Sequence, residues 1–345
     1  SNDYRSDTSS ALLEVLDGEQ NSHFVDHYID MPVDLSEILF IATANDLSEV
    51  SRPLLDRMEI IEVSSYTKNE KLHIAKEHLV AKQLKKNGLT KKSVRFTDKA
   101  LAKIIDGYTM EAGVRELERM IAAVLRKVVR KNYTVGGVNI EKQIVITDKN
   151  LSEYLGKVKF IKEKASRKNE VGIVRGLAWT AAGGDTLEIE VNVLGGKPEF
   201  ILTGNMGDVM RESAQIALSY VRSVVRKNQI FEENAIHIHI PEGAVPKDGP
   251  SAGITMATAI YSAVTGKPVD ASTAMTGEVT LRGRVMPIGG LKEKLLATKT
   301  AGLKRVLVPL ENKSDVEELE EEIVQGLEIV YVSDMKEVLK LAIVK

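Results

Sequence analysis

The sequence predicts a multidomain protein of mixed class, with an α/β part, a helical part and an α+β part. Its 345 residues are enough for two or three domains that each bury a core. Helical apolar periodicity dominates the middle of the chain, whereas short apolar strands and helices occur on either side of it. We therefore expect a partial α/β domain at 1–66, a helical domain at 67–155, a linker at 156–170 and a mixed domain at 171–345.

The first part is predicted to hold one helix and one strand. The helix covers Ser9–Leu16, and the apolar run Glu37–Ala44 predicts a buried strand. This strand ends at Asn45, and a polar loop then leads to Leu54-Leu55-Asp56-Arg57. By residue type alone, Asn45 is typical of a turn after a strand, and Arg57 of an exposed surface charge.

The middle of the chain is predicted to form a helical bundle with a short strand near Ile144–Ile146. Amphipathic spacing predicts helices over Glu70–Lys86, Asp98–Tyr108 and Val114–Asn132. Arg115 stands at the start of the third helix, where an arginine is usually a surface residue. Residues 156–170 are rich in Lys, Arg and Glu with little apolar periodicity, which is typical of a linker.

The last part mixes strands with helices. A long helix is expected over Gly207–Lys227, and strands over Gly172–Ala178, Thr186–Leu194, Glu199–Thr203, Ala235–Ile240, Arg305–Val308 and Glu328–Val332. From Ala252 to about Thr265 the residues are apolar nearly all round a helix, so this helix should be buried.

Ser251 is the candidate nucleophile, because it follows the tight turn Gly249-Pro250 and begins the buried helix. Free backbone N–H groups and the positive end of the helix dipole converge at such a place, where they can stabilise an oxyanion formed during acyl transfer. The alternative is a plain N-cap serine, a role for which no chemistry is needed.

Lys294 is the candidate base. It shares one helix face with Leu291, Leu295 and Thr298, whereas Lys292 lies about 100° round the helix and is better placed to reach solvent. An ammonium held among apolar side chains loses solvation, so its pKa falls and the neutral amine can accept a proton from serine. The alternative is a lysine whose head group reaches the surface at a helix start.

Two histidines precede the nucleophile. In Ala235–Ile240 the isoleucines alternate with His237 and His239, so both histidines lie on one face of a strand and could border the site. The pattern leaves open whether one of them is a base or whether both lie on a solvated face. No metal site is predicted, because the sequence has no Cys and no acidic ligand stands at a supporting spacing.

The run Asp248-Gly249-Pro250-Ser251-Ala252-Gly253-Ile254-Thr255-Met256 resembles the signature of the Lon family of ATP-dependent serine proteases, and the resemblance includes Gly289-Gly290-Leu291-Lys292-Glu293-Lys294. It implies that Ser251 is the nucleophile and Lys294 the general base. Thr276 matches a family threonine that helps to orient the lysine, although by residue type it would be a hydroxyl at a strand end. His239, Asp248 and Glu278 match family residues near the active site.

Residues 1–66 resemble the second half of an AAA+ ATPase core. The resemblance implies that Asn45 is the sensor for the attacking water, Arg57 the arginine finger and Arg115 the second sensor, which would contact a nucleotide phosphate. However, the sequence has neither a G-x-x-x-x-G-K-[ST] loop nor a strand ending in paired acidic residues. We therefore expect the later part of a longer protease that uses ATP and Mg²⁺, with at most ATP-independent peptidase activity here, since peptide-bond chemistry requires no cofactor.

The resemblance further implies a hexameric ring that degrades misfolded and regulatory proteins. Composition predicts no membrane partner, because no apolar stretch reaches about 18 residues, and the absence of Cys suits the cytoplasm. Residues 68–99 are basic and residues 311–328 are acidic, both typical of solvated faces. Two rival functions are a nucleic-acid-binding module that uses the basic helices, since DNA binding is known in the family, and an assembly fragment of a AAA+ machine with a latent protease site.

Overall fold

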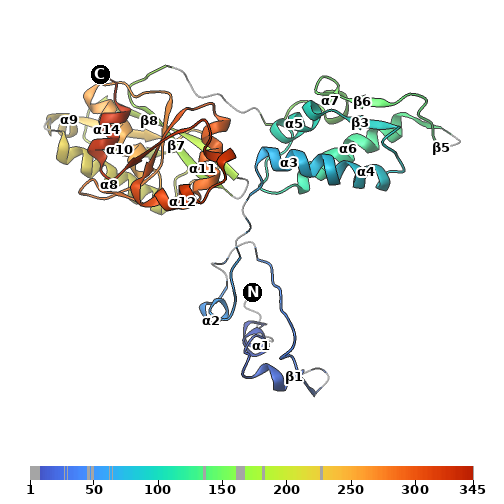
Figure 1. Ribbon diagram of the computed structural model, residues 1–345. Coiled ribbons are helices and arrows are strands. Elements are labelled where there is room, and N and C mark those ends of the chain that lie inside the picture. Colours follow the sequence, from blue (N-terminus) through green and yellow to red (C-terminus); the bar gives the residue numbers. More distant parts are fainter. Residues whose placement is uncertain are drawn as a thin grey trace. The chain divides into compact units, whose positions relative to one another are not determined.

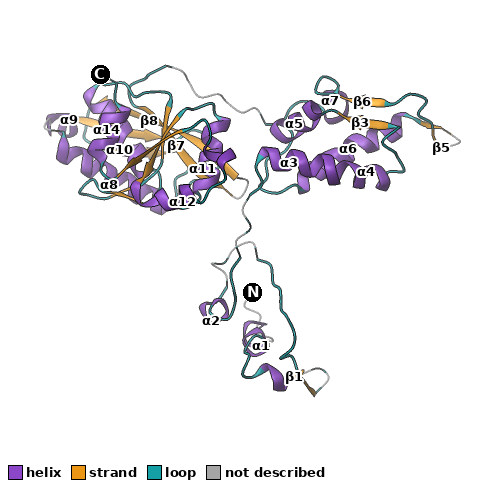
Figure 2. Cartoon of the chain, viewed as in Figure 1, coloured by secondary structure: helices purple, strands orange, loops and turns teal. Residues whose placement is uncertain are grey.

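The computed structural model of the protein describes residues 8–26, 28, 30–44, 47, 50–61, 63, 65–134, 137–160, 168–180, 183–225 and 228–344 (Figures 1 and 2). The chain divides into two compact units, Ser1–Ser64 and Ser65–Lys345. Within the described residues, no helix is long and apolar enough to cross a membrane.

The first unit contains few regular elements. They are α1 (Thr8–Val15), the 3₁₀ turn η1 (Asn21–His23), strands β1 (Phe24–Asp26) and β2 (Met31–Val33), and α2 (Arg52–Leu55). The two strands pair as an antiparallel hairpin. The helix predicted over Ser9–Leu16 is confirmed by α1.

The buried strand predicted over Glu37–Ala44 is wrong for this structure. Residues 38–44 have no regular structure, and Ile38, Leu39 and Ile41 are 50, 84 and 84% exposed. A buried strand needs neighbouring strands on both edges and a covering layer on both faces. No strand in the described part of the chain pairs with this segment, so its apolar side chains remain in contact with solvent.

The helical part of the second unit has its own core. Its elements are α3 (Lys68–Ile74), the π-helical turn η2 (Ala75–Leu79), α4 (Val80–Lys86), β3 (Val94–Phe96), α5 (Asp98–Gly107), α6 (Arg115–Lys131), β4 (Tyr133–Thr134), β5 (Gly137–Val138), β6 (Ile144–Ile146) and α7 (Leu151–Leu155). A capping box between Thr67 and Glu70 begins α3. Leu101, Ile104 and Leu117 are fully buried in the core. The three predicted helices are confirmed, with the π-helical turn inside the first.

The rest of the second unit is built on a seven-stranded mixed sheet in the order β15-β14-β11-β7-β8-β10-β9. These strands are β7 (Ile173–Thr180), β8 (Gly183–Gly195), β9 (Phe200–Thr203), β10 (Asn234–His239), β11 (Thr273–Met275), β14 (Arg305–Pro309) and β15 (Glu328–Val332). Strand β8 runs antiparallel to β7 and to β10, whereas the other neighbours are parallel. All six predicted strands are confirmed, and β11 was not predicted.

Helices and short elements complete this part. They are α8 (Asp208–Val224), α9 (Asn228–Glu233), α10 (Gly253–Thr265), the hairpin of β12 (Glu278–Val279) and β13 (Val285–Met286), α11 (Leu291–Thr300), the 3₁₀ turn η3 (Leu310–Asn312), α12 (Lys313–Glu317), α13 (Glu321–Val324) and α14 (Met335–Ala342). The long helix predicted before the nucleophile is confirmed by α8, and the apolar helix after it by α10.

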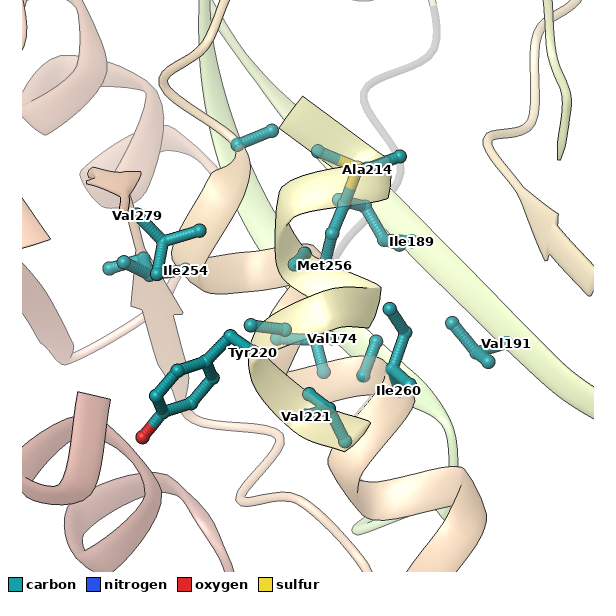
Figure 3. Close-up of a cluster of buried hydrophobic side chains, with 14 of the residues drawn as sticks. Val174, Ile189, Val191, Ala214, Tyr220, Val221, Ile254, Met256, Ile260 and Val279 are labelled. Atoms are coloured by element: carbon teal, nitrogen blue, oxygen red, sulfur yellow. The ribbon is translucent and has the colours of Figure 1, made fainter. Parts of the chain in front are cut away.

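Two apolar cores fill the space around the sheet. In the larger core, α10 packs on β7, β8 and α8, and Figure 3 shows Met256 and Ile260 among Ile189, Ala214 and Val221. The smaller core joins Leu177 of the sheet to Leu291 and Leu295 of α11. Helix α10, which follows the candidate nucleophile, and helix α11, which carries the candidate base, are therefore both fixed by packing on the sheet.

Gly184 allows α11 to lie close to β8. A Cβ atom built at Gly184 would come within 1.9 Å of the carbonyl oxygen of Glu293, a main-chain atom of α11. We predict that Gly184→Ala will lower the free energy of unfolding by about 1–3 kcal/mol, because the helix must move away from the sheet. Urea denaturation measures this loss. The matched control is Gly195→Ala on the same strand, whose nearest neighbour would be 3.9 Å away; an equal loss in both variants would contradict the packing explanation.

Candidate active site

Ser251 lies in the turn between β10 and α10. Gly249, at φ +116°, supplies a backbone conformation that other residues rarely adopt. The half-buried serine follows two residues later, and its carbonyl oxygen accepts hydrogen bonds from the Gly277 amide at 2.8 Å and the Thr276 hydroxyl at 3.2 Å. The main chain of the candidate nucleophile is therefore held by the segment that follows β11.

Two backbone amides remain available at this turn. The Gly253 amide donates to the Pro250 carbonyl at 3.1 Å, and the Ile254 amide donates to the Gly277 carbonyl at 3.1 Å. By contrast, the amides of Ser251 and Ala252 have no acceptor among the residues that the structure describes. They stand at the N-terminus of a 13-residue helix, where an oxyanion is favoured by N–H donors and by the helix dipole.

Lys294 is buried in the smaller apolar core. Its side chain lies on the face of α11 that also carries Leu291 and Leu295, and the residue is 2% exposed. Burial lowers the pKa of Lys294 from 10.5 to about 8, and the neighbouring Glu293 carboxylate opposes the shift only in part. Its ammonium makes no hydrogen bond or ion pair with any described residue. Lys292 is less buried and lies 3.9 Å from Glu320.

The structure does not join the candidate base to the nucleophile by a direct hydrogen bond: within the described residues, none links the Ser251 hydroxyl to Lys294. The two are connected through β11. Ala274 of this strand lies in the same core as Leu295, and Thr276, just after the strand, donates its hydroxyl to Ser251 O. Thr276 thus hydrogen-bonds to the nucleophile's carbonyl oxygen, a partner that residue type could not have indicated.

Asp248 anchors the nucleophile turn to α8. Its Oδ1 accepts from the Met210 amide at 2.9 Å and from the Gly249 amide at 2.8 Å. The N-cap of α8 is Gly207, which has no side chain to cap the helix, so Asp248 satisfies one of the free amides. Ser213 of α8 adds a long hydrogen bond from its hydroxyl to the Pro250 carbonyl at 3.4 Å. Sequence reasoning missed Ser213, because nothing in its local pattern indicates a partner 37 residues away.

His239 and His237 both contact Thr203 of β9. The Thr203 hydroxyl lies 2.9 Å from His237 Nε2 and 2.8 Å from His239 Nδ1, and both imidazoles are half-buried. Glu278 lies half-buried in β12, opposite Met286 of β13. No group of three or more His, Asp or Glu side chains in the described residues could hold a metal ion.

The residues predicted to bind nucleotide lie in different parts of the chain. Arg57 forms an ion pair with Asp17 at 3.0 Å within the first unit. Arg115 is exposed at the first position of α6 and lines a groove of about 330 Å³. The other cationic residues of this groove are Lys86, Arg119 and Arg126. Asn45 lies outside the described residues.

A pair of substitutions tests the capping role of Asp248. Asp248→Ala removes the acceptor for the Met210 amide and should lower the free energy of unfolding by about 1 kcal/mol. Asp248→Asn keeps a side-chain oxygen at the same place and should retain most of that stability. Chemical denaturation of the three proteins measures both effects. An asparagine variant as unstable as the alanine variant would show that the negative charge, and not the hydrogen bond, is required.

Models of known protein families match three parts of the chain. Residues 145–345 match the Lon protease (S16) C-terminal proteolytic domain, residues 85–137 match the Lon protease AAA+ ATPase lid domain, and residues 1–66 match the ATPase family associated with various cellular activities (AAA). These matches confirm the predicted fold class: part of an AAA+ core, a helical AAA+ part and a Lon-type protease domain.

Relatives are similar along the full length of the chain. It is 57% identical to the Lon protease of Lachnoclostridium phytofermentans, 56% identical to that of Bacillus thuringiensis and 53% identical to Lon protease 1 of Bacillus subtilis. All of this chain is aligned in each case, but it spans only 47, 43 and 44% of those proteins. With the proteolytic-domain match over 145–345, these identities show that the chain belongs to the Lon protease family.

Proposed function

We propose that this chain carries the peptide-hydrolysing site of an ATP-dependent serine endopeptidase, with Ser251 as nucleophile and Lys294 as general base. The observation that carries the proposal is the burial of Lys294, which is 2% exposed among leucines on α11. Burial lowers the pKa of this lysine to about 8, so a fraction of it carries the neutral amine near physiological pH, and a neutral amine is what a serine nucleophile requires. Membership of the Lon family supports the same assignment.

The reaction follows from these roles. Neutral Lys294 Nζ accepts the proton of the Ser251 hydroxyl while Oγ attacks the peptide carbonyl carbon. The amides of Ser251 and Ala252 stabilise the negative charge that develops on the carbonyl oxygen. The lysine ammonium then protonates the departing amine as the C–N bond breaks, leaving an acyl-enzyme. A water molecule attacks this ester while Lys294 again accepts the proton, and the returned proton releases Ser251.

Thr276, Asp248, His239 and Glu278 are proposed to support this chemistry rather than to take part in it. Thr276 holds the carbonyl of Ser251, and Asp248 fixes the turn on α8. His239 and His237 both lie within hydrogen-bond distance of the Thr203 hydroxyl. The proposed role of His239 is therefore to hold the ends of β9 and β10 together next to the loop that leads to Ser251. Glu278 lies two residues after Thr276 in β12.

In the larger protein we propose that ATP and Mg²⁺ power the delivery of misfolded or regulatory polypeptides to a hexameric ring. The residues present do not fit a complete ATP and Mg²⁺ site. The phosphate-binding loop and the paired acidic residues are absent from the sequence, and Arg57 is paired with Asp17. No step of peptide hydrolysis requires them. The cytoplasm, and DNA binding by the basic helices, remain predictions from the sequence, and the family matches do not favour nucleic-acid binding or assembly as the main role.

Three single substitutions test the catalytic assignment on a short unstructured fluorogenic peptide. Ser251→Ala and Lys294→Ala should each lower kcat by at least about a thousand-fold, because each removes a group that forms or transfers bonds. Lys292→Ala should keep most of the activity, since this lysine lies near Glu320 instead of in the apolar core. ATP should change none of these rates.

These measurements distinguish a wrong assignment of the catalytic residues from a correct site that is inactive in this chain. An equal loss of kcat in Lys292→Ala and Lys294→Ala would contradict the assignment of Lys294 as the base. If the parent chain hydrolyses no peptide, its mass after treatment with a serine-directed fluorophosphonate shows whether Ser251 can act as a nucleophile. A single adduct on Ser251 indicates an assembled nucleophile, and no adduct contradicts the proposal.

The pH dependence of kcat/KM tests the state of Lys294. The pKa of this lysine is lowered from 10.5 to about 8, so the reactive neutral form is the minority below pH 8 and predominates above it. Activity should therefore rise about ten-fold per pH unit below pH 8 and level off above it. Circular dichroism at each pH checks that the protein stays folded. A flat profile between pH 6 and 9 would contradict the proposal.

A further inference from the structure

A second buried lysine stands four residues before the nucleophile. Lys247 is 7% exposed, and its Nζ donates hydrogen bonds to the carbonyl oxygens of Glu242 at 2.7 Å and Val245 at 3.0 Å. Burial lowers the pKa of Lys247, whereas the Glu242 carboxylate raises it. Unlike Lys294, this lysine has acceptors for its protons, and the hydrolytic mechanism leaves it unused.

The main chain of Lys247 is fixed as firmly as its side chain. Its amide donates to the Asn205 carbonyl at 3.0 Å, and its carbonyl accepts from the Gly207 amide at 2.7 Å. These bonds form an isolated parallel bridge between Met206 and Lys247, outside the strands of the sheet. Lys247 therefore joins the loop after β10 to the segment that begins α8.

The loop that the ammonium closes is tightly folded. Glu242 has a positive φ of 62°, which is unfavourable for a residue with a side chain and must be held by its surroundings. Its carbonyl accepts from the Val245 amide at 3.0 Å as well as from Lys247. Removing the ammonium would leave the Val245 carbonyl without this donor and would loosen the contact that keeps Glu242 in place.

The residues after Lys247 are docked on α8. Asp248 accepts from the Met210 amide at 2.9 Å, and Pro250 accepts from the Ser213 hydroxyl at 3.4 Å. Ser251 is the next residue. The position of its hydroxyl thus depends on a chain of contacts that starts at the Lys247 ammonium.

We propose that Lys247 is a positioning residue. Two hydrogen bonds from its ammonium to the carbonyl oxygens of Glu242 and Val245, called the clasp from here on, hold residues 242–247 together and thereby set the place at which the turn to Ser251 meets α8. This inference rests on the proposed function for its effect on hydrolysis. The ordering of residues 241–251 is independent of that function and can be measured separately.

The experiment compares the full chain with Lys247→Met, which keeps an unbranched side chain but removes the donors, and with Lys247→Arg, which can still donate to two carbonyls. Lys304→Met, at an exposed lysine of the same domain, controls for the loss of a positive charge. Three quantities are measured: kcat and KM on the fluorogenic peptide, the rate of fluorophosphonate labelling at Ser251, and amide hydrogen exchange of residues 241–251. Thermal unfolding shows whether each variant is folded.

For Lys247→Met we expect kcat and the labelling rate to fall about ten- to hundred-fold, as for a displaced catalytic group. KM should stay within about two-fold, and the pH midpoint of kcat/KM should not move, because Lys294 remains the base. Exchange of residues 241–251 should quicken while the rest of the domain keeps its protection. Lys247→Arg should recover part of the rate, and Lys304→Met should behave as the parent.

Other outcomes overturn the proposal in distinct ways. If kcat and the amide hydrogen exchange of residues 241–251 are both unchanged in Lys247→Met, the clasp does not position Ser251. Loss of the pH dependence would make Lys247 the base instead of a positioning residue. If Lys247→Met fails to fold, Lys247→Arg is compared with the parent chain instead. A folded Lys247→Arg whose kcat and labelling rate are as low as those expected for Lys247→Met would contradict the clasp. A parent chain that neither hydrolyses peptide nor labels at Ser251 would overturn the proposed function, while hydrogen exchange would still decide the clasp.

Discussion

The proposed peptide-hydrolysing site depends on the burial of one amine. Lys294 extends into an apolar core at 2% exposure, and no described residue accepts a hydrogen bond from its ammonium. An ion in such surroundings loses its hydration, and the Glu293 carboxylate compensates this loss only in part, so the protonated form is disfavoured. Keeping the lysine there requires α11 to pack closely on the sheet. Two glycines allow this, since a Cβ at Gly184 would meet the Glu293 backbone and a Cβ at Gly290 would meet the Trp179 side chain at 2.9 Å.

Two lysines in the same domain show that burial alone does not decide a chemical role. Both Lys247 and Lys294 are less than a tenth exposed, and burial lowers the pKa of both. Two carbonyl oxygens accept hydrogen bonds from Lys247 and compensate its ammonium. Lys294 has apolar neighbours instead. This difference fits the two proposed roles, in which Lys247 holds a loop and Lys294 exchanges a proton.

The sequence predicted those parts of the fold that have a clear period. Alternation in Ala235–Ile240 gave β10, and the shared helix face of Leu291, Lys294 and Leu295 correctly placed the lysine in a core. Strand β11 has only three residues, all buried, so no period could reveal it. The strand predicted over Glu37–Ala44 failed because apolar composition shows a preference for burial but not the presence of neighbouring strands.

The partners within the site were harder to predict than its members. Ser251 and Lys294 stand in local motifs, whereas the partner of Thr276 is a carbonyl 25 residues away and that of Asp248 is an amide 38 residues away. Residue type cannot specify such contacts, because the folding of β11 and α8 against the turn decides them. Thr276 illustrates this: the sequence placed it in the site, but only the fold shows that it bonds to the nucleophile's main chain. The catalytic roles themselves stay predictions that substitution must test.

Peptide chemistry and nucleotide chemistry differ in what they require of this chain. The groups proposed for hydrolysis come from β11, α8, α10, α11 and the loops between them, which pack on a single sheet. Local desolvation lowers the pKa of Lys294 and makes its neutral form accessible, so proton transfer needs no energy from a nucleotide. Nucleotide hydrolysis, by contrast, depends on a phosphate loop and acidic residues that the sequence lacks, and Arg57 is already paired with Asp17. Under the proposed function, ATP in the larger protein would govern which polypeptides reach Ser251, whereas the packing that buries Lys294 would set the supply of its neutral amine for bond cleavage.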